Sequence, residues 1–221
     1  MERRFAGLFF ALEGILYAAF LAGDIADWPY TAPLKFCAII LVALCGLKAG
    51  RSKENRAVTA ALLLTVLADV FLLVLNRHYA VGIALFLAVQ LLYAVRLARS
   101  AGSRPWRGVL LRGALALAAG TALVKFGPVA ALSGAYICCF AVNLAQAVGQ
   151  AAHAPERKRT LFAVGLALFF LCDLCVGANN LPAAMLPVWI PGFVRVAMWG
   201  FYLPGQVLIL LSTGVFEEEK R

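Results

Sequence analysis

Long apolar stretches recur along the chain, separated by short polar or charged segments. The stretches are continuous and do not alternate with polar positions, which is typical of membrane-spanning helices and not of barrel strands. They predict eight transmembrane helices, at residues 5–23, 30–48, 57–75, 79–97, 108–124, 128–149, 160–178 and 195–214. The segment 181–194 is apolar but holds three prolines, so we expect it to be an outer-surface or re-entrant piece.

The composition supports this interpretation. Hydrophobic residues make up 63% of the 221 positions and charged residues only 14%, whereas a soluble domain has about 25% charged residues. Since every backbone polar group must be satisfied internally in lipid, continuous apolar runs of this kind form helices. We therefore expect residues 1–221 to be a single integral membrane domain with an all-α, polytopic helix-bundle fold.

The distribution of positive charge predicts the orientation in the membrane. A net charge of +9 would suggest nucleic acid binding in a soluble protein, but here the basic residues lie in short loops, and we expect no nucleic acid partner. Of the 20 Lys and Arg residues, only Lys35, Arg77, Lys125 and Arg195 lie at one set of helix ends. Because the richer side is cytoplasmic, both termini are predicted in the cytoplasm. The short loops and Ala- and Leu-rich helices favour a bacterial inner membrane.

Two parts of the chain resemble each other. "LADVFLLVLN" at 67–76 is similar to "LCDLCVGANN" at 171–180, and each is followed by a helix with a central glutamine, Gln90 or Gln206. The two segments lie in predicted helices that cross the membrane in the same direction. This pattern indicates a possible 4+4 parallel half-repeat.

Three acidic residues fall inside predicted membrane helices: Glu13, Asp69 and Asp173. A charged side chain at a helix centre costs about 2.5–3.5 kcal/mol on insertion scales, so such residues are candidates for function. Asp69 lies about 18 Å along its helix from the cytoplasmic end, and Asp173 about 20 Å, at 1.5 Å per residue. We therefore expect the two aspartates at nearly the same depth.

Other polar side chains are predicted near that layer. They are Gln90, Tyr93, Asn143, Gln146, Tyr202 and Gln206, with Lys35 at an outer helix end. Such residues either bridge helices or orient a bound molecule. The two histidines, His78 and His153, lie on opposite sides of the membrane, so they cannot build a His-rich zinc centre, and we expect no metal and no cofactor.

Two carboxyl groups at one depth suit acid–base chemistry. Like charges held close together do not both ionise, so one group can stay protonated while the other is a carboxylate. The first can then donate a proton and the second accept one. A Ser–His or Cys–His pair at matching depth is absent from the sequence pattern, which argues against a covalent acyl intermediate.

Two motifs carry a family resemblance. The first comprises Ala68-Asp69, the run Tyr79-x-x-Gly82-x-x-x-Phe86, and Gln90-Leu91-Leu92-Tyr93; the second is Phe169-Phe170-Leu171-Cys172-Asp173. Together with Tyr202 and Gln206, they make the chain similar to the lysoplasmalogenase-like membrane family, also called the YhhN family. Ala68 and Cys172 stand where the family typically has Gly and Ser.

The resemblance implies a hydrolase that cleaves the vinyl ether bond of lysoplasmalogen to a fatty aldehyde and a glycerophospho-base. Asp69 and Asp173 would be the catalytic pair. Gln90, Tyr93, Asn143, Tyr202 and Gln206 would orient substrate or water, and Lys35, Arg77 or Arg195 would contact the lysophospholipid phosphate. The alternative from the residues is a proton-coupled transporter or a lipid-binding membrane protein that uses the acids as a relay. The sequence leaves the oligomeric state open.

Overall fold

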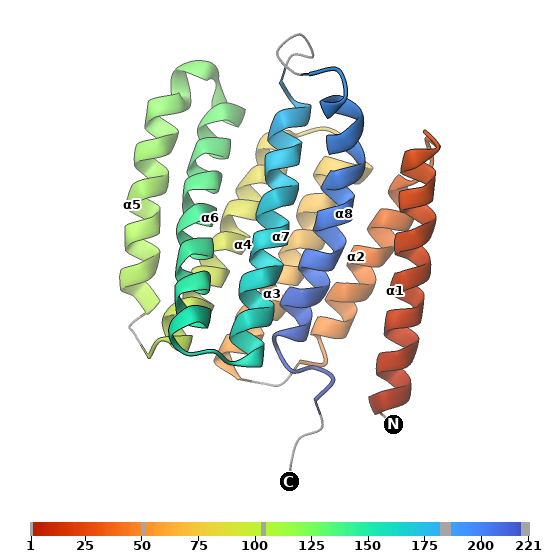
Figure 1. Cartoon of the computed structure of the whole chain (residues 1–221). Helices are drawn as coiled ribbons and strands as arrows, with labels where there is room; N and C mark the ends of the chain where they lie inside the picture. The colour runs from red at the N-terminus through yellow and green to blue at the C-terminus, as the bar shows by residue number, and fades with distance from the viewer. Residues whose placement is uncertain (1, 50–51, 103–104, 182–186, 218–221) are drawn as a thin grey trace.

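The computed structural model describes residues 2–49, 52–102, 105–181 and 187–217, which form a bundle of α-helices with no strand among them (Figure 1). The helices are α1 (Glu2–Ile25), α2 (Ala32–Gly46), α3 (Lys53–Asp69), α4 (Tyr79–Ser100), α5 (Pro105–Leu123), α6 (Pro128–His153), α7 (Arg157–Asn179) and α8 (Ile190–Leu211). A π-helical turn, Val70–Val74, extends α3, and a 3-10 turn, Val124–Phe126, extends α5. The prediction of an all-α bundle is confirmed.

Most of these helices can cross a membrane. Seven of the helices in the described ranges are long and apolar enough to span one, whereas α2 has 15 residues and a complete span takes about 20. The chain is thus a multi-pass helical membrane protein, and the eighth crossing stays a prediction. Helix α1 begins and α8 ends at the same end of the bundle (Figure 1), as an even number of crossings requires.

The helix neighbours describe a closed ring. Helices α2, α3, α4, α6, α7 and α8 each pack against the next, and α8 returns to α2. Helix α1 lies outside this ring against α2 and α8, and α5 lies outside it against α4 and α6. Exchanging α1–α4 with α5–α8 maps this set of neighbours onto itself, an arrangement compatible with the half-repeat, which itself stays a prediction.

Helices α7 and α8 approach closely because a glycine of each faces the other. A Cβ atom added to Gly165 would lie 2.9 Å from the carbonyl oxygen of Gly205, and one added to Gly205 would lie 3.0 Å from that of Gly165. Larger residues would therefore push the two helices apart. This contact fixes the height of α8 against α7, and with it the height of Tyr202 relative to Asp173.

Several predicted boundaries differ from the structure by a few residues, most of all the start of α8. Helix α8 begins at Ile190 and not at 195, because Pro191 lies in its first turn, where the missing N–H and the fixed φ of proline are tolerated. Of the predicted outer-surface or re-entrant piece 181–194, residues 182–186 lie outside the described residues and 190–194 belong to α8. The predicted helix 57–75 corresponds to one continuous span, Lys53–Val74, whose α-helical part ends at Asp69 and whose last turn is π-helical.

Candidate active site

Asp69 lies where α3 changes from α-helical to π-helical geometry. The N–H of Leu75 donates to the carbonyl oxygen of Val70 at 2.8 Å, which is a π-helical hydrogen bond. Such turns occur frequently at functional sites. The side chain of Asp69 is only 4% exposed, and its Oδ2 accepts a hydrogen bond of 2.8 Å from the hydroxyl of Tyr202 in α8.

Asp173 has a similar partner from a different helix. It lies in α7, is half-buried, and its Oδ2 accepts a hydrogen bond of 2.5 Å from the hydroxyl of Tyr136 in α6. The ring of Tyr202 packs at 5.4 Å against that of Phe169, which lies one turn before Asp173 in α7, so the two acid–phenol pairs are neighbours. Four helices of the ring thus bring two acid–phenol pairs together inside the bundle.

Aromatic rings hold the two phenols in place. Phe169, one turn before Asp173 in α7, is fully buried, and its ring centroid lies 5.4 Å from that of Tyr202 and 5.0 Å from that of Phe140. The ring of Tyr136 packs against Phe140 at 5.8 Å. Because rings in van der Waals contact have little rotational freedom, both hydroxyl groups are directed at their carboxyl groups before any ligand binds.

A chain of polar side chains approaches Asp173 from the other side of the bundle. Arg112 of α5 is 3% exposed, and its Nε donates to Oδ1 of Asn143 at 2.6 Å. The Nδ2 of Asn143 donates in turn to Oε1 of Gln90 at 2.9 Å, and Gln90 interacts with the side chain of Tyr136. Asn143 and Gln90 are thereby placed in a network that supports Tyr136, behind the acid pair.

Two more predicted site residues, Gln206 and Tyr93, are fully buried. Gln206 follows Tyr202 by one turn of α8, and neither atom of its buried amide makes a hydrogen bond to the described residues. The hydroxyl of Tyr93 is likewise buried without such a partner, while its ring packs edge-on against Phe162 at 5.4 Å. Their proposed contact with substrate or water stays a prediction.

Lys35 and Glu13 have no hydrogen bond to the acid pair. The ammonium of Lys35 donates to Oδ1 of Asp24 at 2.7 Å and lies over the ring of Trp199 at 5.2 Å. Its charge is therefore already compensated by a buried carboxylate. Glu13 is buried in α1, and neither oxygen of its carboxyl group makes a hydrogen bond to the described residues.

Tyr136 and Arg112 are site residues that the sequence did not indicate. Tyr136 stands in an otherwise apolar run, and its position could be found only by knowing that α6 packs against α7. Arg112 is counted by sequence among the charges at the cytoplasmic helix ends, whereas the structure buries it between α5 and α6. The sequence signal that could have indicated Arg112 is its position inside the predicted span 108–124. The structure shows that its side chain faces Asn143.

The arrangement suits proton transfer in both directions. Each acid has a phenol that can stabilise its carboxylate form, so each can act with or without its proton. Within the described ranges, His, Cys, Asp and Glu residues form no group of three or more that could bind a metal ion. The chemistry available from these side chains is general acid and general base catalysis.

The fold and the site together define a multi-pass membrane protein with a paired-carboxylate centre. Residues 29–213, most of the chain, match the sequence model of the YhhN family. The chain belongs to this family, which confirms the resemblance identified from the two motifs. No curated protein and no solved structure matches it significantly.

Proposed function

We propose that the protein is a membrane-embedded hydrolase that cleaves the vinyl ether bond of lysoplasmalogens. The observation that carries the proposal is the pair of Asp69, which is buried, and Asp173, which is half-buried. Each accepts a hydrogen bond from a tyrosine, and the two tyrosines pack on the ring cluster of Phe169 and Phe140. Membership of the YhhN family supports the same reaction. The apolar bundle is suited to a substrate that never leaves the membrane.

Hydrolysis of a vinyl ether needs a proton donor and a proton acceptor but no nucleophilic side chain. One aspartate, protonated, donates its proton to the vinyl carbon that does not carry the oxygen, which generates an oxocarbenium ion. The other, a carboxylate, stabilises the cation and takes a proton from the attacking water, so that a hemiacetal forms. The hemiacetal then collapses: the first aspartate regains a proton from its hydroxyl, and the second protonates the departing glycerol oxygen. Both acids return to their starting states.

The tyrosines act through the acids. A phenol can donate to a carboxyl group in either form, and it stabilises the ionised form more strongly than the protonated one. Tyr202 and Tyr136 therefore hold Asp69 and Asp173 in place through both halves of the cycle. Gln206, which follows Tyr202 by one turn and has an unpartnered buried amide, is a candidate to hold the hydrolytic water.

The head group would lie at the outer end of the bundle. There, Arg77 is exposed just beyond the π-helical turn that follows Asp69, so its guanidinium is available to a phosphate. Arg195 forms an ion pair with Asp27, and Lys35 is held by Asp24; either cation would have to exchange a carboxylate for the lipid. In the proposed orientation both termini are cytoplasmic and the protein lies in the cell membrane.

The test is to incubate the purified protein in detergent with a lysoplasmalogen in deuterated water. We expect fatty aldehyde and glycerophospho-base in equal amounts, with one deuterium on the carbon next to the aldehyde, because protonation of the vinyl group takes a solvent-derived proton. The matching lysolipid with a saturated ether should remain intact. A transporter would need a gradient and would leave the lipid unaltered. If the folded protein releases no aldehyde, the proposal is contradicted.

A further inference from the structure

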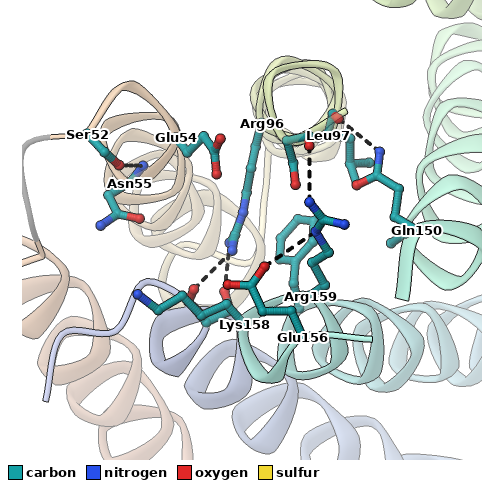
Figure 2. A pocket seen from close by; sticks show the side chains of 13 residues that line it. Ser52, Glu54, Asn55, Arg96, Leu97, Gln150, Glu156, Lys158 and Arg159 are labelled. Atoms are coloured by element: carbon teal, nitrogen blue, oxygen red, sulfur yellow. Dashed lines mark hydrogen bonds and ion pairs between the residues drawn. The ribbon is translucent and has the colours of Figure 1, made fainter. Parts of the chain in front are cut away.

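A second polar site lies at the end of the bundle where α1 begins and α8 ends. A cavity of about 230 Å³ opens there among the ends of α3, α4, α6, α7 and α8 (Figure 2). Its charged and hydroxyl-bearing lining includes Glu54, Arg96, Glu156, Lys158, Arg159 and Ser212. Since one water occupies about 30 Å³ of liquid volume, the cavity is large enough for a small organic ion.

Arg96 gives this cavity a positive charge that no carboxylate neutralises directly. Its side chain is 6% exposed, and its two terminal nitrogens donate to the hydroxyl and the carbonyl oxygen of Ser212, at 2.7 and 3.1 Å. The guanidinium carbon lies 4.0 Å from the centroid of the Phe162 ring. Among the described residues no acid forms an ion pair with it, although buried charges are normally paired.

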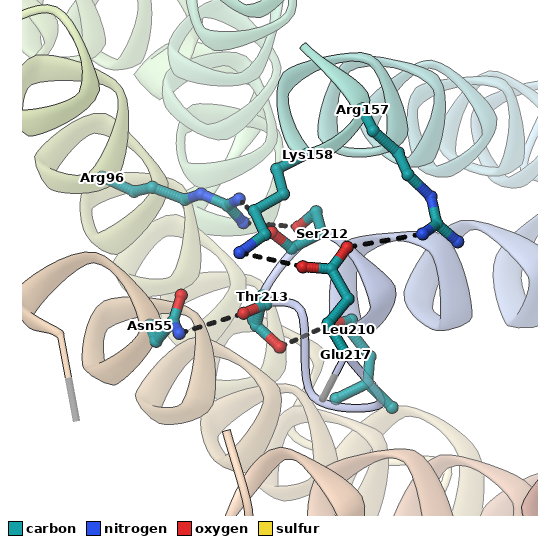
Figure 3. Close-up of polar contacts among 8 residues, drawn as sticks. All are labelled: Asn55, Arg96, Arg157, Lys158, Leu210, Ser212, Thr213 and Glu217. Atoms are coloured by element: carbon teal, nitrogen blue, oxygen red, sulfur yellow. Dashed lines mark hydrogen bonds and ion pairs between the residues drawn. The ribbon is translucent and has the colours of Figure 1, made fainter. Parts of the chain in front are cut away.

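Arg159 supplies a buried donor without a hydrogen-bond partner. Its Nε makes no hydrogen bond to the described residues, although it forms a long ion pair with Glu156 at 3.6 Å, and a terminal nitrogen donates to the carbonyl oxygen of Ser100 at 3.4 Å. Lys158 is paired more closely, because Glu217 of the C-terminal segment lies 3.1 Å from it and also pairs with Arg157 (Figure 3). Arg96 is therefore the lining cation without an ion pair among the described residues, and Arg159 the one with the longest ion pair; both are guanidinium groups, which match the geometry of phosphate oxygens.

Two acids line the same cavity and restrict the ligand further. Glu54 interacts electrostatically with Arg96 without forming an ion pair, and Glu156 lies beside Arg159. Both would repel a simple anion. A ligand with a positive group next to its phosphate would satisfy the arginines and the glutamates together.

The cavity is separate from the aspartate pair. Ser212, which holds Arg96, lies about 15 Å along α8 from Tyr202, which holds Asp69, at 1.5 Å per residue. The residues that line the cavity include neither aspartate and neither of the tyrosines bonded to them. The cavity is thus no extension of the proposed catalytic site.

We propose that this cavity binds a phosphoester that also carries an ammonium group, with the phosphate on Arg96 and Arg159 and the ammonium beside Glu54 and Glu156. Two sources share this chemistry: the head group of a zwitterionic membrane lipid and a water-soluble amino phosphoester. The proposal stands on the cavity alone. It is tested by binding and does not depend on the vinyl ether reaction.

The experiment is calorimetry on the purified full chain in detergent, with phosphoethanolamine, glycerol phosphate and ethanolamine as probes. Phosphoethanolamine should bind at least about tenfold more tightly than either of the others, as expected when a charged hydrogen-bonded contact is lost. Arg159→Gln and Glu54→Gln should each weaken its binding by a similar factor. Arg157→Gln is the control, because that exposed side chain lies on the same turn of α7 but does not line the cavity.

Three binding results would contradict the proposed ligand. Absence of binding by phosphoethanolamine, equal binding of glycerol phosphate, or an unchanged affinity in Arg159→Gln would overturn the proposal. Binding of phosphoethanolamine to the protein in nanodiscs distinguishes the two sources of the ligand. If phosphatidylethanolamine discs block the soluble probe and phosphatidylglycerol discs do not, the ligand is a lipid head group. If the probe binds equally in both, the ligand is soluble. The circular dichroism spectrum of each variant shows whether it is folded.

Discussion

Removing the hydroxyl of Tyr202 tests whether the phenol supports catalysis by Asp69. In Tyr202→Phe the ring remains packed against Phe169 and Trp199, at 5.4 and 5.0 Å, so the fold of the bundle is retained. What is lost is the hydrogen bond of 2.8 Å to Oδ2 of Asp69. The change therefore isolates one interaction of one catalytic acid.

The magnitude follows from the burial of the pair. A hydrogen bond to a charged group contributes about 1.5–3 kcal/mol. Asp69 is 4% exposed, so water cannot easily replace the lost donor. If the full amount is lost in the transition state, kcat falls by about 10-fold to 150-fold, since 1.4 kcal/mol corresponds to a factor of ten. The stability of the folded protein should fall as well, by about 1–3 kcal/mol.

The assay is aldehyde release under saturating substrate, which separates kcat from KM. We expect a fall in kcat with little change in KM, because the phenol acts through the acid and not through substrate binding. Tyr79→Phe is the matched control: its hydroxyl donates to Oδ1 of Asn76 at 2.7 Å in an exposed position, and its activity should equal that of the wild type. A Tyr202→Phe enzyme that is folded and as fast as the control would refute the reasoning.

Three further predictions concern stability and are checked by thermal unfolding in detergent. Lys35→Met leaves the buried Asp24 without its cation and should lower the free energy of unfolding by about 3–5 kcal/mol. The double variant with Asp24→Asn should recover part of this loss. An unchanged melting temperature for Lys35→Met would contradict the prediction. Gly165→Ala places a methyl group 2.9 Å from the α8 backbone and should cost about 1–3 kcal/mol, whereas Gly149→Ala, which has open space, should not destabilise. Tyr93→Phe removes a buried hydroxyl without a partner among the described residues, so stability should stay the same or rise by about 1 kcal/mol; a clear fall would mean that the hydroxyl has a bonded water.

The sequence predicts the helices well because their signal is local. A continuous apolar run fixes a membrane helix whatever its neighbours are, so each predicted span overlaps one observed helix. The errors lie where local chemistry competes with that signal. Pro191 is compatible with a first helical turn, so α8 starts earlier than expected, and the π-helical turn after Asp69 leaves no mark in the hydropathy pattern.

The residues of the candidate site are likewise only partly predictable from the sequence. The rise per residue gives a depth for Asp69 and Asp173, and the structure brings their tyrosine partners onto one cluster of aromatic rings. The partners depend on which helices are neighbours, which one sequence does not contain. For this reason the sequence does not indicate Tyr136, places Arg112 among the end charges, and does not indicate that Asp24 pairs with Lys35.

The most direct test of the central claim is aldehyde release from lysoplasmalogen by purified Asp69→Asn and Asp173→Asn proteins. Each change keeps the size of the side chain and removes its acid–base function. Glu13→Gln is the control, because Glu13 is a buried membrane acid that makes no hydrogen bond to the described residues. We expect both aspartate variants to fold and to lose at least about 100-fold of the rate, within the range for general acid–base groups, while Glu13→Gln retains it. A rate close to that of the wild type in either aspartate variant would rule out the paired-aspartate mechanism.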